Sequence, residues 1–450
     1  LAAEGIAGAG AEKVGIAGAL AVAYSQSSTK AWLGDRTKLG DPATVGDIGA
    51  VSISADNTSK LSAKAWSAAL AGKVGIGASI AILRSDNAYR AWVGDHAEIT
   101  AASLNLAARN HVITGAPPFD WSVLTDLENR FTETNLQILL GQNNYYTETI
   151  AGAGSNKVAV TGAFSVNVFE DLTEASIGTA TKITATNAVT VEADNSTTAK
   201  AFAGGIAAAG KVGVGLASAD IVNESMTRAS IGIDARIEDS SAIDIDAAAT
   251  MDLAVISASA GAAGTAGASG VLSLIDSKNA VEAFAGDGSV LRSRGNIGIV
   301  ASNTFEALGV AGVAGIGGTA GVGVSAGTFL IDNRSEAWTG DAADLAAAGL
   351  IQVGATSTQD LTSVVVGGAG GGTAGVAASA AVNVYKPITQ AWIGDNGRVN
   401  ADISDANLTG RTLRVSADSI TELLSIVGTV GIGGTAGVGG AADVVVLTKK

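Results

Sequence analysis

The chain has 450 residues, of which 47% are hydrophobic, only 4% are aromatic and 60 are glycine. Small apolar residues among glycines favour thin, tightly stacked layers over a bulky globular core. The net charge of −15 makes nucleic acid and anionic membrane surfaces unfavourable partners, and the lack of cysteine excludes disulfides and thiolate chemistry. Residue 1 lies inside a repeat, so we expect any export signal to lie outside this sequence.

A five-residue motif, Ala-aromatic-x-Gly-Asp, recurs along the chain. With two Ala-Ser-Ile-Gly variants at 175–178 and 229–232 included, the successive intervals between its leading alanines are 60, 84, 54, 54, 54 and 54. A second track has intervals of 60, 84, 54, 54, 54, 54 and 62, and it consists of Lys13, Lys73, Lys157, Lys211, Thr265, Thr319, Thr373 and Thr435. Both tracks predict a 54-residue repeat with insertions near residues 40–47, 113–148 and 402–410.

Short stretches within each repeat, such as residues 212–221 and 242–246, alternate with period two and predict β-strands. Gly-Asp, Asp-Asn and Asn-Ser pairs are interpreted as the turns between them. The sequence therefore predicts an all-β parallel solenoid over residues 1–112 and 151–450, continuing past residue 450. A repeat of 54 divides into three rungs of 18 or two of 27, which would give a rod about 110 or about 75 Å long.

Each repeat also has a glycine-dense half, for example residues 315–323. Glycine normally weakens a strand and is acceptable where another backbone approaches too closely for a Cβ atom. We therefore expect one very tightly packed face.

The Ala-aromatic-x-Gly-Asp motif has two interpretations. The favoured one is a stacked aromatic ladder followed by a turn in which Gly takes positive φ and Asp accepts hydrogen bonds. The other is a sugar-binding strip, which Ser176 and Ser230 would interrupt. The predicted structural ladder consists of Trp32, Gly34, Asp35, Trp92, Gly94, Asp95, Gly178, Gly232, Phe284, Gly286, Asp287, Trp338, Gly340, Asp341, Trp392, Gly394 and Asp395.

Residues 113–150 form a non-repetitive insertion. Val123, Leu127 and Phe131 follow a helical period, with Asp120 as a possible N-cap, so the segment is predicted to be partly helical. It packs on the rod or serves as a partner-binding or subunit-contact element. The aromatic residues that would make this contact are Phe119, Trp121, Phe131, Tyr145 and Tyr146.

Other chemistry finds little support in the sequence. Four uncharged runs, at 253–275, 307–331, 361–385 and 423–442, are long enough for membrane spans, but their glycine content and lack of aromatic belts argue against spanning. Acidic turns at 238–241, 287–289 and 402–405 could hold Ca²⁺, although solvated turns are favoured and no cofactor is expected. Only two histidines, His96 and His111, are available as catalytic bases, and we expect no enzyme.

The repeat unit resembles a known class of proteins. Residues 313–323, Asp332-Asn333, residues 336–341 and the V-x-A strand that follows are similar to repeats of very large filamentous-haemagglutinin-like and leukotoxin-type filamentous adhesins of Gram-negative bacteria. The resemblance covers nearly the whole chain except residues 113–148. It implies a right-handed β-helix that reaches the cell surface through an outer-membrane partner.

The expected function is therefore structural: an extracellular rod, stalk or filament segment of a giant surface adhesin, or a self-assembling surface fibre. Its expected partners are copies or continuations of the same array and a host or neighbouring-cell surface. The alternative is a carbohydrate-binding or carbohydrate-cleaving β-helix protein.

Overall fold

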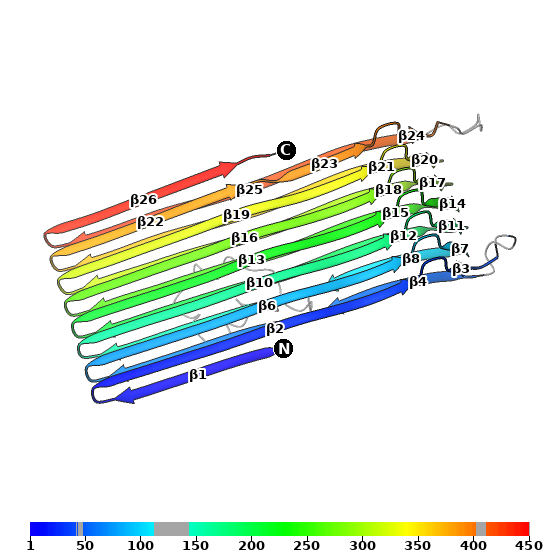
Figure 1. The fold of residues 1–450 in the computed structure, drawn as a ribbon. Helices are drawn as coiled ribbons and strands as arrows, with labels where there is room; N and C mark the ends of the chain where they lie inside the picture. Colours follow the sequence, from blue (N-terminus) through cyan, green and yellow to red (C-terminus); the bar gives the residue numbers. More distant parts are fainter. Residues whose placement is uncertain (42, 44–47, 112–143, 402–410, 450) are drawn as a thin grey trace, which may run out of the picture.

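The computed structural model describes residues 1–41, 43, 48–111, 144–401 and 411–449. In this part of the chain the strands form three sheets in which each strand pairs in parallel with the equivalent strand of the next repeat (Figure 1). The predicted all-β parallel solenoid is confirmed. The segment predicted to be helical falls mainly on residues 112–143, which lie outside the described residues.

Two sheets are built from long strands. Sheet A contains β1 (Ala2–Ala11), β4 (Ala50–Thr58), β5 (Leu61–Ala71), β8 (Ser103–His111), β9 (Tyr145–Ser155), β12 (Val189–Ala209), β15 (Ile243–Ala263), β18 (Ile297–Gly317), β21 (Leu350–Gly371) and β25 (Thr412–Gly433). Sheet B contains β2 (Val14–Leu33), β6 (Val74–Val93), β10 (Val158–Ile177), β13 (Val212–Ile231), β16 (Ala266–Ala285), β19 (Ala320–Thr339), β22 (Ala374–Tyr385), β23 (Ile388–Ile393) and β26 (Ala436–Leu447).

The third sheet is narrow and closes one side of the molecule. Sheet C contains β3 (Lys38–Leu39), β7 (Glu98–Ala101), β11 (Lys182–Ala185), β14 (Arg236–Ser240), β17 (Val290–Ser293), β20 (Asp344–Ala347) and β24 (Arg398–Val399). Each coil of the solenoid follows a strand of sheet A, reverses at a tight turn, returns along sheet B and passes through sheet C (Figure 1).

One repeat makes a single coil. Strands β12, β13 and β14 complete one circuit, after which β15 lies beside β12 and Ile243 lies opposite Val189, its equivalent in the preceding repeat. Both expected rung counts, three of 18 and two of 27, are therefore wrong. The reason is that alternation continues through the glycine-dense segments, so that strands such as β13 extend over 20 residues without a break.

The shape follows from this long coil. Eight sheet A strands stacked at about 4.8 Å extend about 38 Å along the solenoid axis in the described chain, whereas a strand of 20 residues spans about 66 Å. The described residues therefore form a wide, flattened block (Figure 1), and the expected rod of about 110 or 75 Å is incorrect.

A change in pairing offset locates the long insertion. In sheet A, Asn57 pairs with Asn110, whereas Leu61, which follows closely in the sequence, pairs with Tyr145. The extra residues of the later coil thus lie between His111 and Tyr145, and the solenoid resumes at Tyr145. Residues 145–150, which were assigned to the insertion, belong to β9 instead.

The interior changes character along each coil. Next to sheet C, aliphatic side chains such as Ile183, Ile237 and Leu291 form one large buried cluster. A second cluster, which includes Leu253 and Phe305, lies farther along the long strands. The part of each coil on both sides of the tight turn has mainly glycine, alanine and serine inside. We call it the glycine wing, represented by residues 203–209 of β12 and 212–218 of β13.

The two sheets of the glycine wing approach each other backbone to backbone. A Cβ atom on Gly205 would lie 2.5 Å from the carbonyl oxygen of Leu216, and one on Gly213 would lie 2.5 Å from that of Ala262. The close packing expected for one face is thus located in the interior, between the facing sides of sheets A and B. The turn itself carries the Lys and Thr track, and the amide of Thr319 donates to the carbonyl of Thr265 at 2.9 Å.

We predict that Gly213→Ala lowers the free energy of unfolding by about 1 to 3 kcal/mol, because the methyl group would meet the Ala262 backbone. The matched control is Gly312→Ala, whose added Cβ finds its nearest neighbour at 3.9 Å. Urea unfolding followed by circular dichroism measures both variants. Equal midpoints for the two alanine variants would contradict the backbone contact.

Candidate functional site

The aromatic side chains of the repeated motif stack on one another along the outside of sheet B. The rings of Trp32 and Trp92 lie 5.0 Å apart with an interplanar angle of 6°, and those of Trp338 and Trp392 lie 5.0 Å apart at 3°. Phe284 stacks on Trp338 with the ring centroids 4.4 Å apart. Because equivalent residues lie opposite each other in parallel strands, this stacking follows directly from the register.

This stacking also limits what the ladder can bind. A sugar would need the flat face of a ring, but Phe284 and Trp392 cover both faces of Trp338, and Trp32 covers one face of Trp92. Ser176 and Ser230 lie opposite Trp92 and Phe284, so the aromatic column is broken in the middle coils. The arrangement is that of a packed stack, with Arg228 placed 5.9 Å above the ring of Phe284.

The aspartates of the motif join successive coils. The amide of Asp95 donates to Oδ1 of Asp35 at 3.0 Å, and the amide of Thr179 donates to Oδ1 of Asp95 at 2.7 Å. The same bond runs from the amide of Asp341 to Asp287 and from the amide of Asp395 to Asp341, at 2.8 Å each. Each carboxylate therefore accepts from the equivalent turn of the next coil.

The glycine of the motif does not take positive φ, contrary to expectation. The left-handed residue is the one after the Asp position, for example Arg36, His96 and Ala342, with φ of 55° in each. In this conformation its amide donates to the next coil, as from Ala342 to the carbonyl oxygen of Asp395 at 2.8 Å. The motif glycine is required for a different reason.

That reason is a close approach between coils. A Cβ on Gly178 would lie 2.6 Å from the carbonyl carbon of Gly94, and one on Gly286 would lie 2.9 Å from that of Gly232. No real Cβ contact is this short, so any side chain would collide with the same turn of the preceding coil. Glycine and aspartate together form a column that fixes the spacing of the turns.

We predict that Asp341→Ala speeds hydrogen exchange at the Asp395 amide and lowers the free energy of unfolding by about 1 kcal/mol, because that amide loses its acceptor. Asp341→Asn is the control, since its Oδ1 can still accept. Heteronuclear NMR exchange measurements separate the two. Unchanged exchange at Asp395 in the alanine variant would rule out the aspartate column as a link between coils.

A polar band crosses the interior between the two aliphatic clusters. Asparagines form its columns: Asn57 Nδ2 donates to Oδ1 of Asn110 at 3.3 Å, and Asn110 Nδ2 donates to Oδ1 of Asn195 at 2.8 Å. From the opposite sheet, Asn279 donates to Asn303 at 3.0 Å. Asn110, Asn195, Asn279 and Asn303 are buried.

Sequence reasoning missed this band because it placed Asp-Asn and Asn-Ser pairs in turns. Asn195 and Asn333 instead lie inside β12 and β19 with their side chains inward. The signal that could have identified them is recurrence in register, as Asn279 lies directly opposite Asn333. Both amide atoms of Asn333 are buried and form no hydrogen bond within the described structure.

One carboxylate lies in the band. Asp171 is buried, accepts from the Tyr145 hydroxyl at 3.0 and 2.9 Å, and accepts from Asn87 Nδ2 at 3.2 Å. Burial raises the pKa of Asp171 to about 7, and the hydrogen bonds from Tyr145 and Asn87 offset part of this increase. Its place in the column corresponds to Asn87 on one side and Ser225 on the other.

Asp171 makes stability depend on pH. Its pKa is higher in the folded chain than in the unfolded chain, so between about pH 4 and 7 the folded state binds more protons. The free energy of unfolding should therefore fall as pH rises through this window and level off above it.

We predict that Asp171→Asn leaves the free energy of unfolding near pH 4 almost unchanged and raises it at pH 8, by an amount on the order of a few kcal/mol. Unfolding midpoints of the original chain and the Asp171→Asn variant, measured from pH 4 to 8, test this. A difference between the two midpoints that stays the same at every pH would refute the prediction.

The structure describes two of the five aromatic residues that were assigned to the insertion. Phe119, Trp121 and Phe131 lie outside the described residues. Tyr145 and Tyr146 lie in β9 and are buried, so they are not exposed contact residues. Tyr145 instead packs on Phe169, with the ring centroids 4.9 Å apart, because β9 enters the interior before the sequence pattern indicates it.

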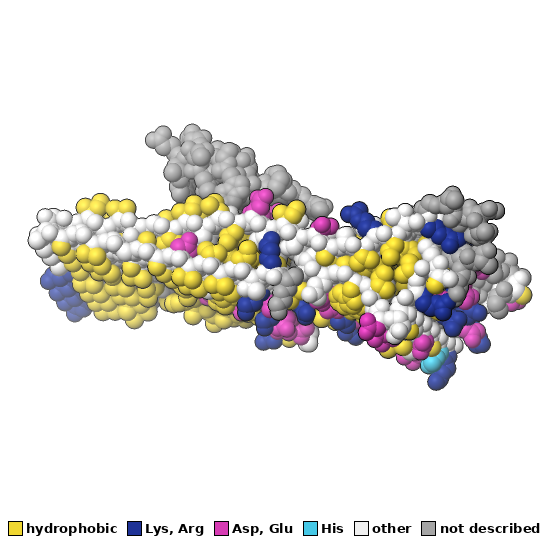
Figure 2. Space-filling model, turned by 90° about the horizontal axis from the view of Figure 1, so that it is seen from above, with side chains coloured by type: hydrophobic (Ala, Val, Ile, Leu, Met, Phe, Trp, Pro, Cys, Tyr) yellow, Lys and Arg dark blue, Asp and Glu magenta, His cyan; other side chains and the backbone are white. Residues whose placement is uncertain are grey.

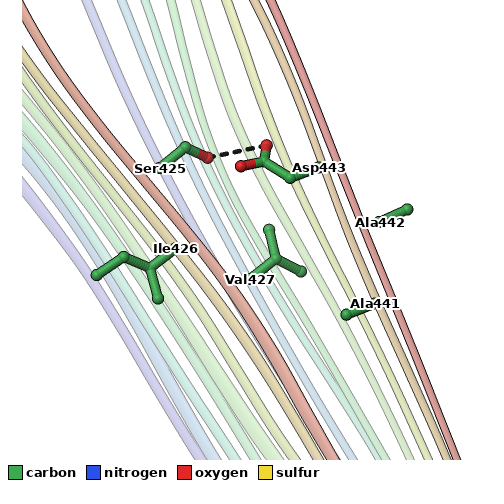
Figure 3. Close-up of a pocket in the computed structure, with 6 residues that line it drawn as sticks. All are labelled: Ser425, Ile426, Val427, Ala441, Ala442 and Asp443. Atoms are coloured by element: carbon green, nitrogen blue, oxygen red, sulfur yellow. Dashed lines mark hydrogen bonds between the residues drawn. The ribbon is translucent and has the colours of Figure 1, made fainter.

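In the described part of the chain, no group of three or more His, Asp or Glu side chains could hold a metal ion. The acidic turn at 402–405 falls outside the described residues. A hollow at the end of the solenoid lies between β25 and β26 (Figure 3). Its single carboxylate, Asp443, accepts from the Ser425 hydroxyl at 2.9 Å.

Comparison with protein-family models, curated proteins and solved structures finds no match to this chain. Within the described residues, no helix is long and apolar enough to cross a membrane.

Proposed function

We propose that this chain is a structural segment of an extracellular filamentous protein at a bacterial cell surface, and that it acts without catalysis. Further coils stack on its ends, either as the continuation of a longer polypeptide or as other copies of the chain. The observation that carries this proposal is that each coil pairs in register with the coil before it and repeats its contacts. The coil formed by β25 and β26 shows which groups a neighbouring coil would cover.

Interior positions of the last coil are open to solvent on one side. Leu423 and Val427 are only partly buried, whereas their partners in the preceding coil, Leu361 and Val365, are 0% and 1% exposed. The hollow between β25 and β26 exposes the same interior (Figure 3). A further coil with the same pattern would cover these side chains and extend the aliphatic cluster.

The backbone edge of the last coil supports the same conclusion. In parallel pairs every second residue donates its amide to the same neighbouring strand. The amide of Ala436 donates to the carbonyl of Thr373, just before β22, and the amide of Thr448 donates to that of Tyr385 in β22. The odd-numbered residues of β26, such as Ala441, therefore point their N–H groups away from the solenoid. Such an edge is a template for pairing with another strand.

The surface location and the adhesive context come from the resemblance of the repeats to filamentous adhesins. The stacked columns of Trp, Asp and Asn side chains are consistent with a spacer, because each coil repeats the contacts of the previous one. We propose no sugar-binding role for the ladder, because its rings stack on one another and Ser176 and Ser230 interrupt the column.

We predict that the purified 450-residue chain associates end to end and that Ala417→Pro with Ala441→Pro abolishes this association. Both residues point their amides toward the open edge, and proline removes the donor while keeping a small side chain. Negative-stain electron microscopy should show stacks for the original chain and single blocks about 38 Å thick for the proline variant.

The matched control is Ala417→Ser with Ala441→Ser, which keeps both amides and should still stack. Single blocks at all concentrations for the original chain would overturn the proposal. Equal stacking by the proline and serine variants would do so as well, because the open edge would then have no part in assembly.

A further inference from the structure

The outer side of sheet B in the glycine wing is an uncharged apolar surface. It consists of the outward residues within 14–20, 74–80, 158–164, 212–218, 266–272, 320–326, 374–380 and 436–442, and we call it the wing face. These eight segments contain no Asp, Glu, Lys or Arg, and every outward residue except Ser218 is apolar or glycine. Its large side chains are exposed: Leu20 by 62%, Leu216 by 43% and Val324 by 50%.

This pattern reverses the usual order of a sheet. The inward positions hold mostly Gly, Ala and Ser because the two backbones meet, as at Gly213 and Gly215, while Val, Leu, Ile and Phe lie at outward positions. Figure 2 shows hydrophobic side chains gathered in rows over the part of the molecule near the tight turns. The apolar side chains of the wing therefore face solvent and bury little within the chain.

The wing face has the size of a stable protein interface. Seven residues span about 23 Å and eight strands span about 38 Å, which gives roughly 900 Å². A standard interface buries about 800 Å² per partner, and monomers rarely expose contiguous apolar patches above a few hundred Å².

Charged side chains border the wing face but do not enter it. Just beyond the wing segments of β6 and β10, Arg84 pairs with Glu170 at an N–O distance of 3.7 Å. Asp220 marks the boundary in β13. An apolar centre with a charged rim is the arrangement of a protein interface.

We propose that the wing face is an interface between two copies of this chain, packed sheet B against sheet B. A single patch that contacts its own equivalent gives a closed, two-fold pair, and two sheets can pack face to face at about 10 Å with aligned strands. This lateral contact is separate from the stacking of coils at the ends and does not depend on it.

A lipid bilayer is the less favourable occupant. Lys13, Lys73, Lys157 and Lys211 stand at the tight turns at the tip of the wing, so insertion would carry four charges into the hydrocarbon. The net charge of −15 also opposes approach to anionic lipid. In a pair of chains the four lysines stay in water at the edge of the contact.

Sheet A is the less suitable face for pairing. Its outward wing positions are mostly small, for example Gly204 and Ala208, with isolated large residues such as Ile206 and Ile316. Sheet B presents large side chains in most coils, including Ile80, Phe164 and Leu272. The larger apolar side chains on the outer side of sheet B would bury more apolar surface area on pairing.

Substitution of outward residues tests the proposal. Leu216→Lys with Val324→Lys places two charges in the wing face, and both side chains point to solvent in the single chain, so the fold is retained. Ile206→Lys with Ile316→Lys is the matched control, with the same change of charge on the outer side of sheet A. Sedimentation velocity at about 1 to 100 µM measures association, and flotation with neutral phosphatidylcholine vesicles measures lipid binding.

We expect the original chain and the sheet A variant to form lateral pairs. The sheet B variant should associate at least about 100-fold more weakly, because each chain would bury two charges without partners. Electron microscopy distinguishes this from stacking at the ends, since pairing doubles the thickness across the sheets. The proposal would be overturned if the original chain formed no lateral pairs at 100 µM. So would equal pairing by both lysine variants, or flotation with vesicles that only the sheet B variant loses.

Discussion

Hydrogen bonding between the backbones of neighbouring coils is the constraint on which the other features of this molecule depend. Because equivalent residues lie directly opposite each other, each type of side chain repeats at the spacing between strands, about 4.8 Å. Tryptophans then stack, carboxylates reach the next turn, and asparagine amides bond along a column. The same short spacing excludes any side chain at the motif glycines such as Gly178, where the turns of two coils meet.

The cross-section of the coil explains why the composition is so unusual. Near sheet C the interior is wide enough for Ile183 and Leu291, and in the middle it holds the asparagine band. In the wing mainly small residues, glycine, alanine and serine, lie between the sheets. Once the interior has no room for large side chains, the apolar residues of the wing lie outside. A low aromatic content and 60 glycines are therefore consequences of a thin, two-layered part of the molecule.

Two kinds of surface follow from this construction, and we propose that both serve association. The open coil at β25 and β26 offers backbone donors and half-covered interior side chains in the direction of the axis. The wing face offers a flat apolar area at right angles to it. On these proposals the molecule would extend by stacking and thicken by lateral pairing, which is the geometry of a fibre. The repeated columns give stiffness because the contacts of each coil reinforce those of the next.

The sequence by itself determined the strand character, the parallel solenoid and the equivalence of marker residues such as Trp338 and Trp392, because these depend on local alternation and recurrence. Only the tertiary structure decided that a repeat makes one coil, since period-two alternation does not indicate where a chain reverses. It also decided that Asn195 and Tyr145 lie inside, because whether a polar residue is in a turn or a core depends on the opposite sheet. The role of Gly178 likewise depends on the turn at Gly94 in the preceding coil, which is so distant in the sequence that no local pattern reveals the contact.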